Sequence, residues 1–416
     1  MSFPLLLLLL LGLSLILLSP GDFVIEAECR IGINYGQVGN NLPAPEKVLQ
    51  LLQSLKMERA RIYDTNPRIL TAFAHSNVQL IVTLENEMLP LLGAADPQPA
   101  LQWVASRILP YIPATNITGI AVGNEVLTYG GAALPYLVPA MLNIRAALAL
   151  HGGLHRTIHV SSPCSAAVLS SSFPPSAGSF LPELGGVMQQ FLQFLAETNS
   201  PFWINAYPYF AYKDDSRMIS LDYILFNPNG GTVDPLTGLH YDNMLYAQVD
   251  AVIFAIYRMG FGGVEVRVSE TGWPSKGGPE ESGATPENAA IYNQNLMRRQ
   301  AADEGTPLRP NVRLEVYVFA LFNEDMKPGP ASERNYGLFR PDGTMAYNVV
   351  GIGPRTTATS QPNAAESNYY PPFTSTPPNT TFSSATHLVK RLEYQSLCCW
   401  MFVYVVISWP RHRLLS

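Results

Sequence analysis

The sequence predicts an α/β protein built as a single (β/α)8 barrel, or TIM barrel, followed by a disordered C-terminal tail. Eight short apolar segments with strand character are each followed by a helical segment or a long loop, and eight such units close naturally into a barrel. The sequence has no glycine-rich phosphate-binding loop after any of these strands, which argues against an open, doubly wound sheet.

The strands are predicted from short apolar runs that end in glycine, proline or polar turn residues. These runs are residues 30–36, 60–64, 79–84, 117–123, 157–161, 202–206, 264–269 and 312–321. The helices are predicted from apolar residues at helical spacing and from prolines at helix starts. They cover residues 45–55, 67–70, 101–109, 136–150, 188–197, 243–259 and 285–303. A long loop is expected between the sixth strand and about Tyr241.

The barrel is expected to occupy residues 29–353, and the N-terminal segment has a different character. Residues 1–28 contain an apolar run without charged residues over residues 5–18, which is short for a membrane span and typical of a signal peptide. The positive charge that usually precedes such a run is missing from the side chains. We therefore expect a secreted protein, located outside the cell or in the cell wall.

The C-terminal segment is expected to lie outside the barrel. Residues 354–396 are rich in Ser, Thr and Pro and predict a disordered stalk or linker, and residues 397–416 form an apolar tail. Small residues at 383–385, a polar spacer and this tail fit a GPI-anchor signal, which would attach the protein to the plasma membrane. Lys390 and Arg391 in the spacer fit it poorly, so an aberrant or truncated C-terminus stays open as the alternative.

The composition favours an extracellular protein that faces neutral polar ligands. Charged residues make up 14% of the chain, and the formal net charge is −6, which argues against a nucleic-acid partner. The four cysteines are too few for a disulfide framework, and whether Cys29 and Cys164 pair stays open. Sequons at Asn116 and Asn379 predict N-glycosylation.

No metal site and no cofactor are predicted. His155 and His159 lie four residues apart, but on a turn and a strand, where this spacing does not align two metal ligands as it does on a helix. The sequence has no G-x-S-x-G motif for a serine nucleophile. We also expect the protein to be a monomer.

Two glutamates are predicted at the mouth of the barrel, because the active sites of such barrels lie at the C-terminal strand ends. Glu125 follows the fourth strand directly, beside Asn124, and Glu270 ends the seventh. A single glutamate there would more often be a solvated loop residue, but a pair suits glycosidic cleavage. That reaction needs one protonated carboxyl for the leaving oxygen and one ionised carboxylate for the oxocarbenium-like centre. The pKa of one must be raised and that of the other kept low.

Six motifs along the barrel resemble those of plant endo-1,3-β-glucanases of glycoside hydrolase family 17. They are GINYG at 32–36, RIYD at 61–64, VGNE at 122–125, NAYPYF at 205–210, SETGWP at 269–274 and FNE at 322–324. The resemblance implies a retaining endo-hydrolase of internal β-1,3-glucosidic bonds in β-1,3-glucans such as callose and laminarin. It implies that Glu125 is the acid/base and Glu270 the nucleophile. It also implies that Glu324, Lys327 and Glu333 lie near the nucleophile.

Aromatic residues near the strand ends support carbohydrate binding, because apolar sugar faces stack on aromatic rings. The predicted substrate-binding residues are Tyr35, Asn124, Tyr207, Phe210, Glu324, Lys327 and Glu333. Trp273 and Phe322 are expected to be core residues, and Lys327 to help keep Glu270 ionised. The alternative function belongs to another class: a cell-wall glucan-binding protein with weak catalysis or none.

Overall fold

Nine parallel strands form one sheet in the computed structural model, which describes residues 31–349. They are hydrogen-bonded in the order β5-β4-β3-β2-β1-β13-β12-β9-β6. Their bounds are β1 Gly32–Tyr35, β2 Arg59–Ile62, β3 Gln79–Leu84, β4 Ile117–Val122, β5 His159–Ser161, β6 Pro163–Ser165, β9 Phe202–Asn205, β12 Val266–Thr271 and β13 Val316–Val318. The predicted signal peptide (1–28), stalk (354–396) and apolar tail (397–416) lie outside the described residues.

The two ends of this strand order, β5 and β6, are separated in the chain by Ser162 alone. β5 pairs with β4 and β6 pairs with β9, so the two short strands share the fifth position and the order runs round a barrel. Pro163, which has no N–H to donate, starts β6 at this interruption. The predicted (β/α)8 barrel is therefore confirmed, with its fifth strand in two pieces.

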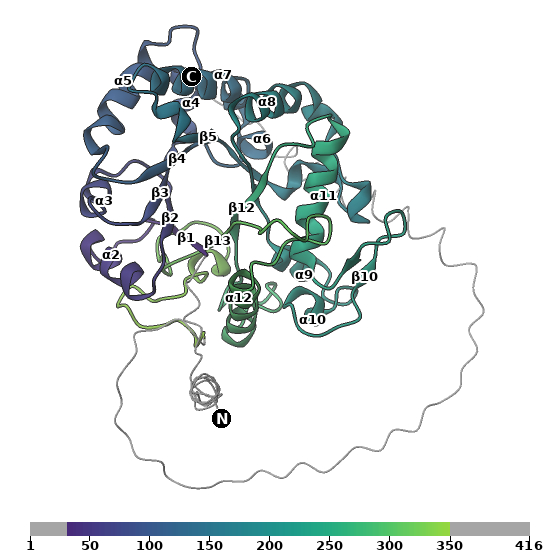
Figure 1. The fold of residues 1–416 in the computed structure, drawn as a ribbon. Helices are drawn as coiled ribbons and strands as arrows, with labels where there is room; N and C mark the ends of the chain where they lie inside the picture. Colours follow the sequence, from purple (N-terminus) through teal and green to yellow (C-terminus); the bar gives the residue numbers. More distant parts are fainter. Residues whose placement is uncertain (1–30, 350–416) are drawn as a thin grey trace, which may run out of the picture. The chain divides into compact units, whose positions relative to one another are not determined.

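Helices surround the strands on the outside of the barrel (Figure 1). The long helices are α2 Pro45–Ser54, α5 Gln98–Arg107, α7 Leu137–Ala149, α8 Gly185–Thr198, α11 Met244–Arg258 and α12 Pro286–Ala301. Together with α3 Pro67–Ala72, they match the seven predicted helices to within a few residues. Their starts carry the expected chemistry: the Thr285 hydroxyl accepts a hydrogen bond from the Asn288 N–H, and Pro286 opens α12.

Two predicted elements were wrong in extent. The segment between β9 and Tyr241, predicted as a long loop, contains α9 Pro208–Asp214, α10 Leu221–Ile224 and the β10–β11 hairpin (Thr232–Val233 and His240–Tyr241). These pieces are too short to show a helical or alternating period. The eighth strand, predicted over residues 312–321, is only three residues long (Val316–Val318), and Val312 is an exposed apolar residue outside the sheet.

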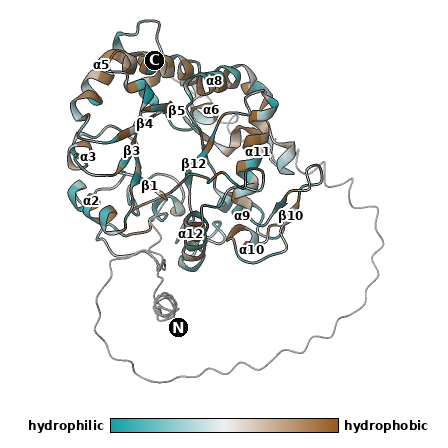
Figure 2. Ribbon diagram, viewed as in Figure 1, coloured by the Kyte–Doolittle hydropathy of each residue, from teal (hydrophilic) through white to brown (hydrophobic). Residues whose placement is uncertain are grey.

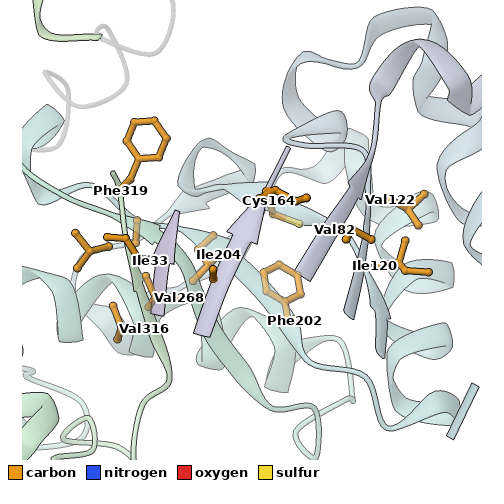
Figure 3. Close-up of a cluster of buried hydrophobic side chains, with 14 of the residues drawn as sticks. Ile33, Val82, Ile120, Val122, Cys164, Phe202, Ile204, Val268, Val316 and Phe319 are labelled. Carbon is orange, nitrogen blue, oxygen red and sulfur yellow. The ribbon is translucent and has the colours of Figure 1, made fainter. Parts of the chain in front are cut away.

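The strands bury different side chains on their two faces, as expected for an alternating period of two. Outward-facing residues pack into the large core, and Figure 3 shows part of it, including Ile33, Val82, Ile204 and Val268. Trp203 belongs to a separate small cluster with Ile81, Ala121 and Tyr317, which we place inside the barrel. A Cβ at Gly119 of β4 would lie 3.1 Å from the Trp203 ring, so glycine leaves room for the indole.

The outer helices carry both hydrophobic and hydrophilic residues (Figure 2). Within residues 31–349, the one helical segment long and apolar enough to cross a membrane by length and composition is Gly131–Ala149. Its α7 part buries seven side chains and contacts α5 and α8, so it is a helix of the barrel. Cys164 on β6 is buried and free, and Cys29 lies outside the described residues.

Candidate active site

Glu270 reaches the interior of the barrel because the alternation of β12 is broken beside it. Val266 and Val268 belong to the outward-facing core, and a regular strand would place Glu270 on that same face. The pairing of β12 with β9 shifts at this point: Val268 pairs with Ile204, but Glu270 pairs with Asn205, the very next residue. Such a bulge redirects a side chain, and the Glu270 carboxylate consequently meets polar groups of other strands.

The Glu270 carboxylate is buried and accepts three hydrogen bonds from side chains. The Arg61 Nη1 lies 2.7 Å and the Tyr63 hydroxyl 2.9 Å from Oε1. The Tyr207 hydroxyl lies 2.8 Å from Oε2. The Arg61 side chain is fully buried, so this ion pair is shielded from water. One cationic and two neutral donors therefore stabilise the negative charge of Glu270.

Glu125 is held at the end of β4 in a left-handed backbone conformation, with φ 56° and ψ 29°. This region is uncommon for residues other than glycine and stores strain of the kind found at functional sites. The conformation is supported on both sides, because the Glu125 N–H donates to the Pro163 carbonyl at 2.8 Å and the Tyr129 N–H donates to the Glu125 carbonyl at 2.9 Å. Glu125 is thus turned off the strand axis at the start of α6 (Val126–Tyr129).

The surroundings of Glu125 favour its protonated form. Burial and the nearby negative charge of Glu270 raise the pKa of the Glu125 carboxyl to about 7. A hydrogen bond of 3.0 Å from the Asn205 amide to Oε1 acts in the opposite direction and limits this rise in pKa. At neutral pH a large share of Glu125 therefore carries a proton.

A polar network joins the two glutamates. Arg61 donates one guanidinium N–H to Glu270 and another to the Asn124 Oδ1, at 2.7 Å. Asn205 donates to Glu125 and accepts a hydrogen bond of 2.7 Å from the Ser269 hydroxyl, which precedes Glu270 in β12. Four strands of the barrel therefore fix the two carboxyl groups relative to each other.

The predicted substrate-binding residues divide into exposed and buried groups. Tyr207 and Asn124 lie within the network around the glutamates. Phe210 lies beside Tyr207 with ring centroids 5.3 Å apart, and at 37% exposed it can still meet a sugar. Tyr35 is only 3% exposed and packs edge-on against Phe322. Trp273 and Phe322 are buried, as predicted.

The three residues expected near the nucleophile have separate partners. Lys327 pairs with Glu333 at 3.4 Å, and its ammonium lies 4.0 Å from the centre of the Phe319 ring. The cation in direct contact with Glu270 is Arg61, and the expectation that Lys327 helps to keep Glu270 ionised stays a prediction. Glu333 adds to the field that raises the pKa of Glu125. Glu324 is buried and bonds to the backbone of Val38.

Sequence reasoning missed Arg61, Tyr63 and Asn205 as site residues, although all three stand in the quoted motifs. The sequence does contain a sign of this role. Ala60 and Ile62 occupy one face of β2 and Arg61 the other, and a buried arginine needs a buried hydrogen-bond partner. Period-two alternation applied to β2 and β9 would have placed Arg61 and Asn205 inside the barrel.

A (β/α)8 barrel whose mouth holds two carboxyl groups in such unlike surroundings has the architecture of a glycoside hydrolase. The sequence profile of the Glycosyl hydrolases family 17 matches residues 31–350. The chain therefore belongs to this family.

Several relatives are similar over most of their length. Glucan endo-1,3-beta-glucosidase 11 of Arabidopsis thaliana is 49% identical over 346 residues, which cover 82% of this chain and 79% of the relative. Glucan endo-1,3-beta-glucosidase 14 of the same plant is 51% identical over 320 residues, covering 77% and 81%. Among solved structures, a beta-1,3-glucanase and allergen of Cryptomeria japonica pollen is 42% identical with a TM-score of 0.73, covering 77% of this chain and 98% of that structure.

Proposed function

We propose that the protein is a retaining endo-hydrolase of internal β-1,3-glucosidic bonds in β-1,3-glucans such as callose and laminarin, with Glu270 as nucleophile and Glu125 as acid/base. The observation that carries the proposal is the asymmetry of the pair. Glu270 accepts three hydrogen bonds, one of them from a buried arginine, whereas burial and the charge of Glu270 raise the pKa of Glu125 to about 7.

The relatives support the choice of substrate. Those that match most of this chain are named as glucan endo-1,3-beta-glucosidases, and their identity of about half the aligned residues extends across the barrel. The residues that surround the two glutamates here, among them Arg61, Tyr63 and Asn205, all come from the motifs that suggested the family.

In the first step, an oxygen of the Glu270 carboxylate attacks the anomeric carbon of the sugar. A bond forms between this oxygen and the carbon, while the bond from the carbon to the glycosidic oxygen breaks. Glu125 gives its proton to the departing oxygen and becomes ionised. Arg61 and Tyr207 keep the attacking carboxylate oriented through their hydrogen bonds.

In the second step, water attacks the same carbon and the bond to Glu270 breaks. Glu125 now acts as base and takes the proton of the water. The charge of Glu270 is absent in the intermediate, so one cause that raises the pKa of Glu125 is removed. The change favours the ionised form of Glu125 when a base is needed, and two inversions leave the β-configuration intact.

The test is the configuration of the first product formed from a defined β-1,3-glucan, followed by proton NMR before mutarotation. The proposal expects the β-anomer to appear first. An initial α-anomer would contradict the double displacement. Glucan binding without release of oligosaccharides would favour the alternative function of a glucan-binding protein.

The proposal includes secretion to the extracellular space or cell wall, where such glucans occur. The side chain of Asn116, in the sequon that opens β4, is exposed, which suits an N-linked glycan at the end of the barrel opposite the mouth. A GPI anchor and a monomeric state belong to the same proposal. Mass spectrometry of the mature protein would show its ends and its glycan, and an unprocessed N-terminus would contradict secretion through a signal peptide.

A further inference from the structure

The loop that follows β1, residues 36–41, is referred to here as the β1 loop. We propose that Glu324 is a positioning residue that anchors the β1 loop at the barrel mouth, and that it acts on glucan binding through this loop rather than as a sugar ligand. The inference rests on the proposed function for its effect on glucan. The anchoring itself stands on contacts within the chain.

Glu324 has almost no surface to offer a sugar, because only 2% of the residue is exposed. Its Oε1 instead accepts a hydrogen bond of 2.8 Å from the backbone N–H of Val38. A buried carboxylate that accepts a backbone N–H holds that segment more firmly than a neutral acceptor would. The side chain is therefore committed to the β1 loop.

The residues after Glu324 hold the same loop. The Met326 N–H donates to the Val38 carbonyl at 3.2 Å, so both backbone groups of Val38 are bound by the segment 324–326. The Asn40 N–H donates to the Asp325 Oδ1 at 3.2 Å. Glu324 is the only buried side chain among these three anchors in the described structure, and the other two lie nearer the surface.

Gly36 is shaped to receive the Glu324 carboxylate. A Cβ at Gly36 would collide with both oxygens and the carboxyl carbon of Glu324. The backbone of Gly36 is not in the left-handed region, so the requirement for glycine here is one of space and not of conformation. Gly36 and Glu324 thus form a complementary pair that joins β1 to the segment after β13.

The β1 loop is connected to the substrate side of the barrel. The Gln37 amide donates to Asp64 at 2.9 Å and accepts from the Asn66 amide at 2.7 Å, which ties the loop to the segment after β2. Val38, at the centre of the loop, is 45% exposed and offers an apolar contact at the rim. Glu270 is held by Arg61, Tyr63 and Tyr207, none of which bonds to Glu324 in the described structure. Loss of the anchor should therefore disturb glucan binding more than bond cleavage.

Four variants test the proposal: Glu324→Ala, the isosteric Glu324→Gln, Gly36→Ala, and the double variant of Glu324→Ala with Gly36→Ala. Amide hydrogen exchange of the peptide covering the β1 loop should speed up strongly in Glu324→Ala and only slightly in Glu324→Gln, whose neutral amide oxygen still accepts from Val38. The KM for laminarin should rise about tenfold in Glu324→Ala and in Gly36→Ala, with kcat changed less than about twofold.

The double variant is the sharper measurement, because removal of the carboxylate makes room for the new methyl group. Its KM should be no higher than that of Glu324→Ala alone, which is non-additive behaviour. Two results would overturn the proposal: unchanged exchange of the β1 loop in Glu324→Ala, or a rise in KM for Glu324→Gln as large as that for Glu324→Ala. A wild-type protein that leaves laminarin intact would overturn the proposed function instead, while the exchange measurement would still decide the anchoring.

Discussion

Glu270 and Glu125 are the same type of residue at the mouth of one barrel, yet the chain builds their surroundings in different ways. A bulge in β12 turns Glu270 inward, towards a buried arginine and two tyrosines. A left-handed turn takes Glu125 off the end of β4, where it keeps one side-chain donor, Asn205. Burial and the charge of Glu270 raise the pKa of Glu125, whereas Glu270 has a buried cation and two hydroxyl donors around it.

The difference teaches that the two roles depend on each other. The negative charge of Glu270 is one of the causes that raise the pKa of Glu125, so the proposed nucleophile helps to keep its proposed acid partner protonated. Asn205 bonds to both sides of the pair, to Glu125 directly and to Glu270 through Ser269. Removal of the Glu270 charge should therefore appear in the titration of Glu125.

The largest effect is expected for Glu270→Gln, because it removes the proposed nucleophile and leaves the three donors without a carboxylate. Laminarin hydrolysis should fall by more than the ~10²–10⁴-fold that a single proton transfer contributes. In Glu270→Ala, azide should enter the vacated space and yield an α-glycosyl azide from an aryl β-glucoside. A β-glycosyl azide from this variant would mean that Glu270 is the acid/base and Glu125 the nucleophile.

Glu87→Gln is the matched control for this change. Glu87 also follows an asparagine, Asn86, near the end of a strand, but its side chain is exposed and outside the network around Glu270. Its hydrolysis rate should stay at the wild-type value, which would show that the loss in Glu270→Gln comes from the site.

Glu125→Gln is expected to have the second-largest effect. The variant keeps the shape of the side chain but cannot donate a proton of comparable acidity, so laminarin hydrolysis should fall by about 10²–10⁴-fold. Bond cleavage in a dinitrophenyl β-glucoside should be much less affected, because this leaving group departs without a proton. Equal losses on the two substrates would contradict the role of Glu125 as the acid.

The fold and the carboxylate pair could be predicted because they depend on local patterns. Short apolar runs that end in polar turns locate the strands, and the residue after each run lies at the barrel mouth. The network could not be predicted in the same way, since Arg61 meets Glu270 across 209 positions of sequence and Asn205 meets Glu125 across 80. The sequence predicts Lys327 as a cation that helps to keep Glu270 ionised, and it does not reveal the ion pair of Lys327 with Glu333.

Burial explains the remaining differences at the site. An aromatic or charged residue after a strand can face the substrate or can be buried among the loops that follow the strands. The residue type alone does not distinguish these two positions. Tyr35 and Glu324 are buried, whereas Tyr207 and Phe210 lie together at the mouth of the barrel. The bulge beside Glu270 also leaves no mark in the residues VRVSET, because any side chain can occupy it.

The smallest effect is expected from Asn205→Ala, which removes the side-chain donor of Glu125 and the acceptor of the Ser269 hydroxyl. The hydrogen bond from Asn205 favours the ionised carboxylate and lowers its pKa, so its loss should raise the pKa of Glu125 further above about 7. Glu125 must be protonated for the first step, and activity falls as pH rises through this pKa. The alkaline limb of kcat/KM should therefore move to higher pH, by less than about one unit. Asn143→Ala, which removes an amide that bonds the carbonyls of Leu92 and Ala94 and has no bond to either glutamate within the described residues, should leave the limb in place. A shift to lower pH in Asn205→Ala would mean that Asn205 stabilises the protonated acid, and the asymmetry between the two glutamates would then need another source.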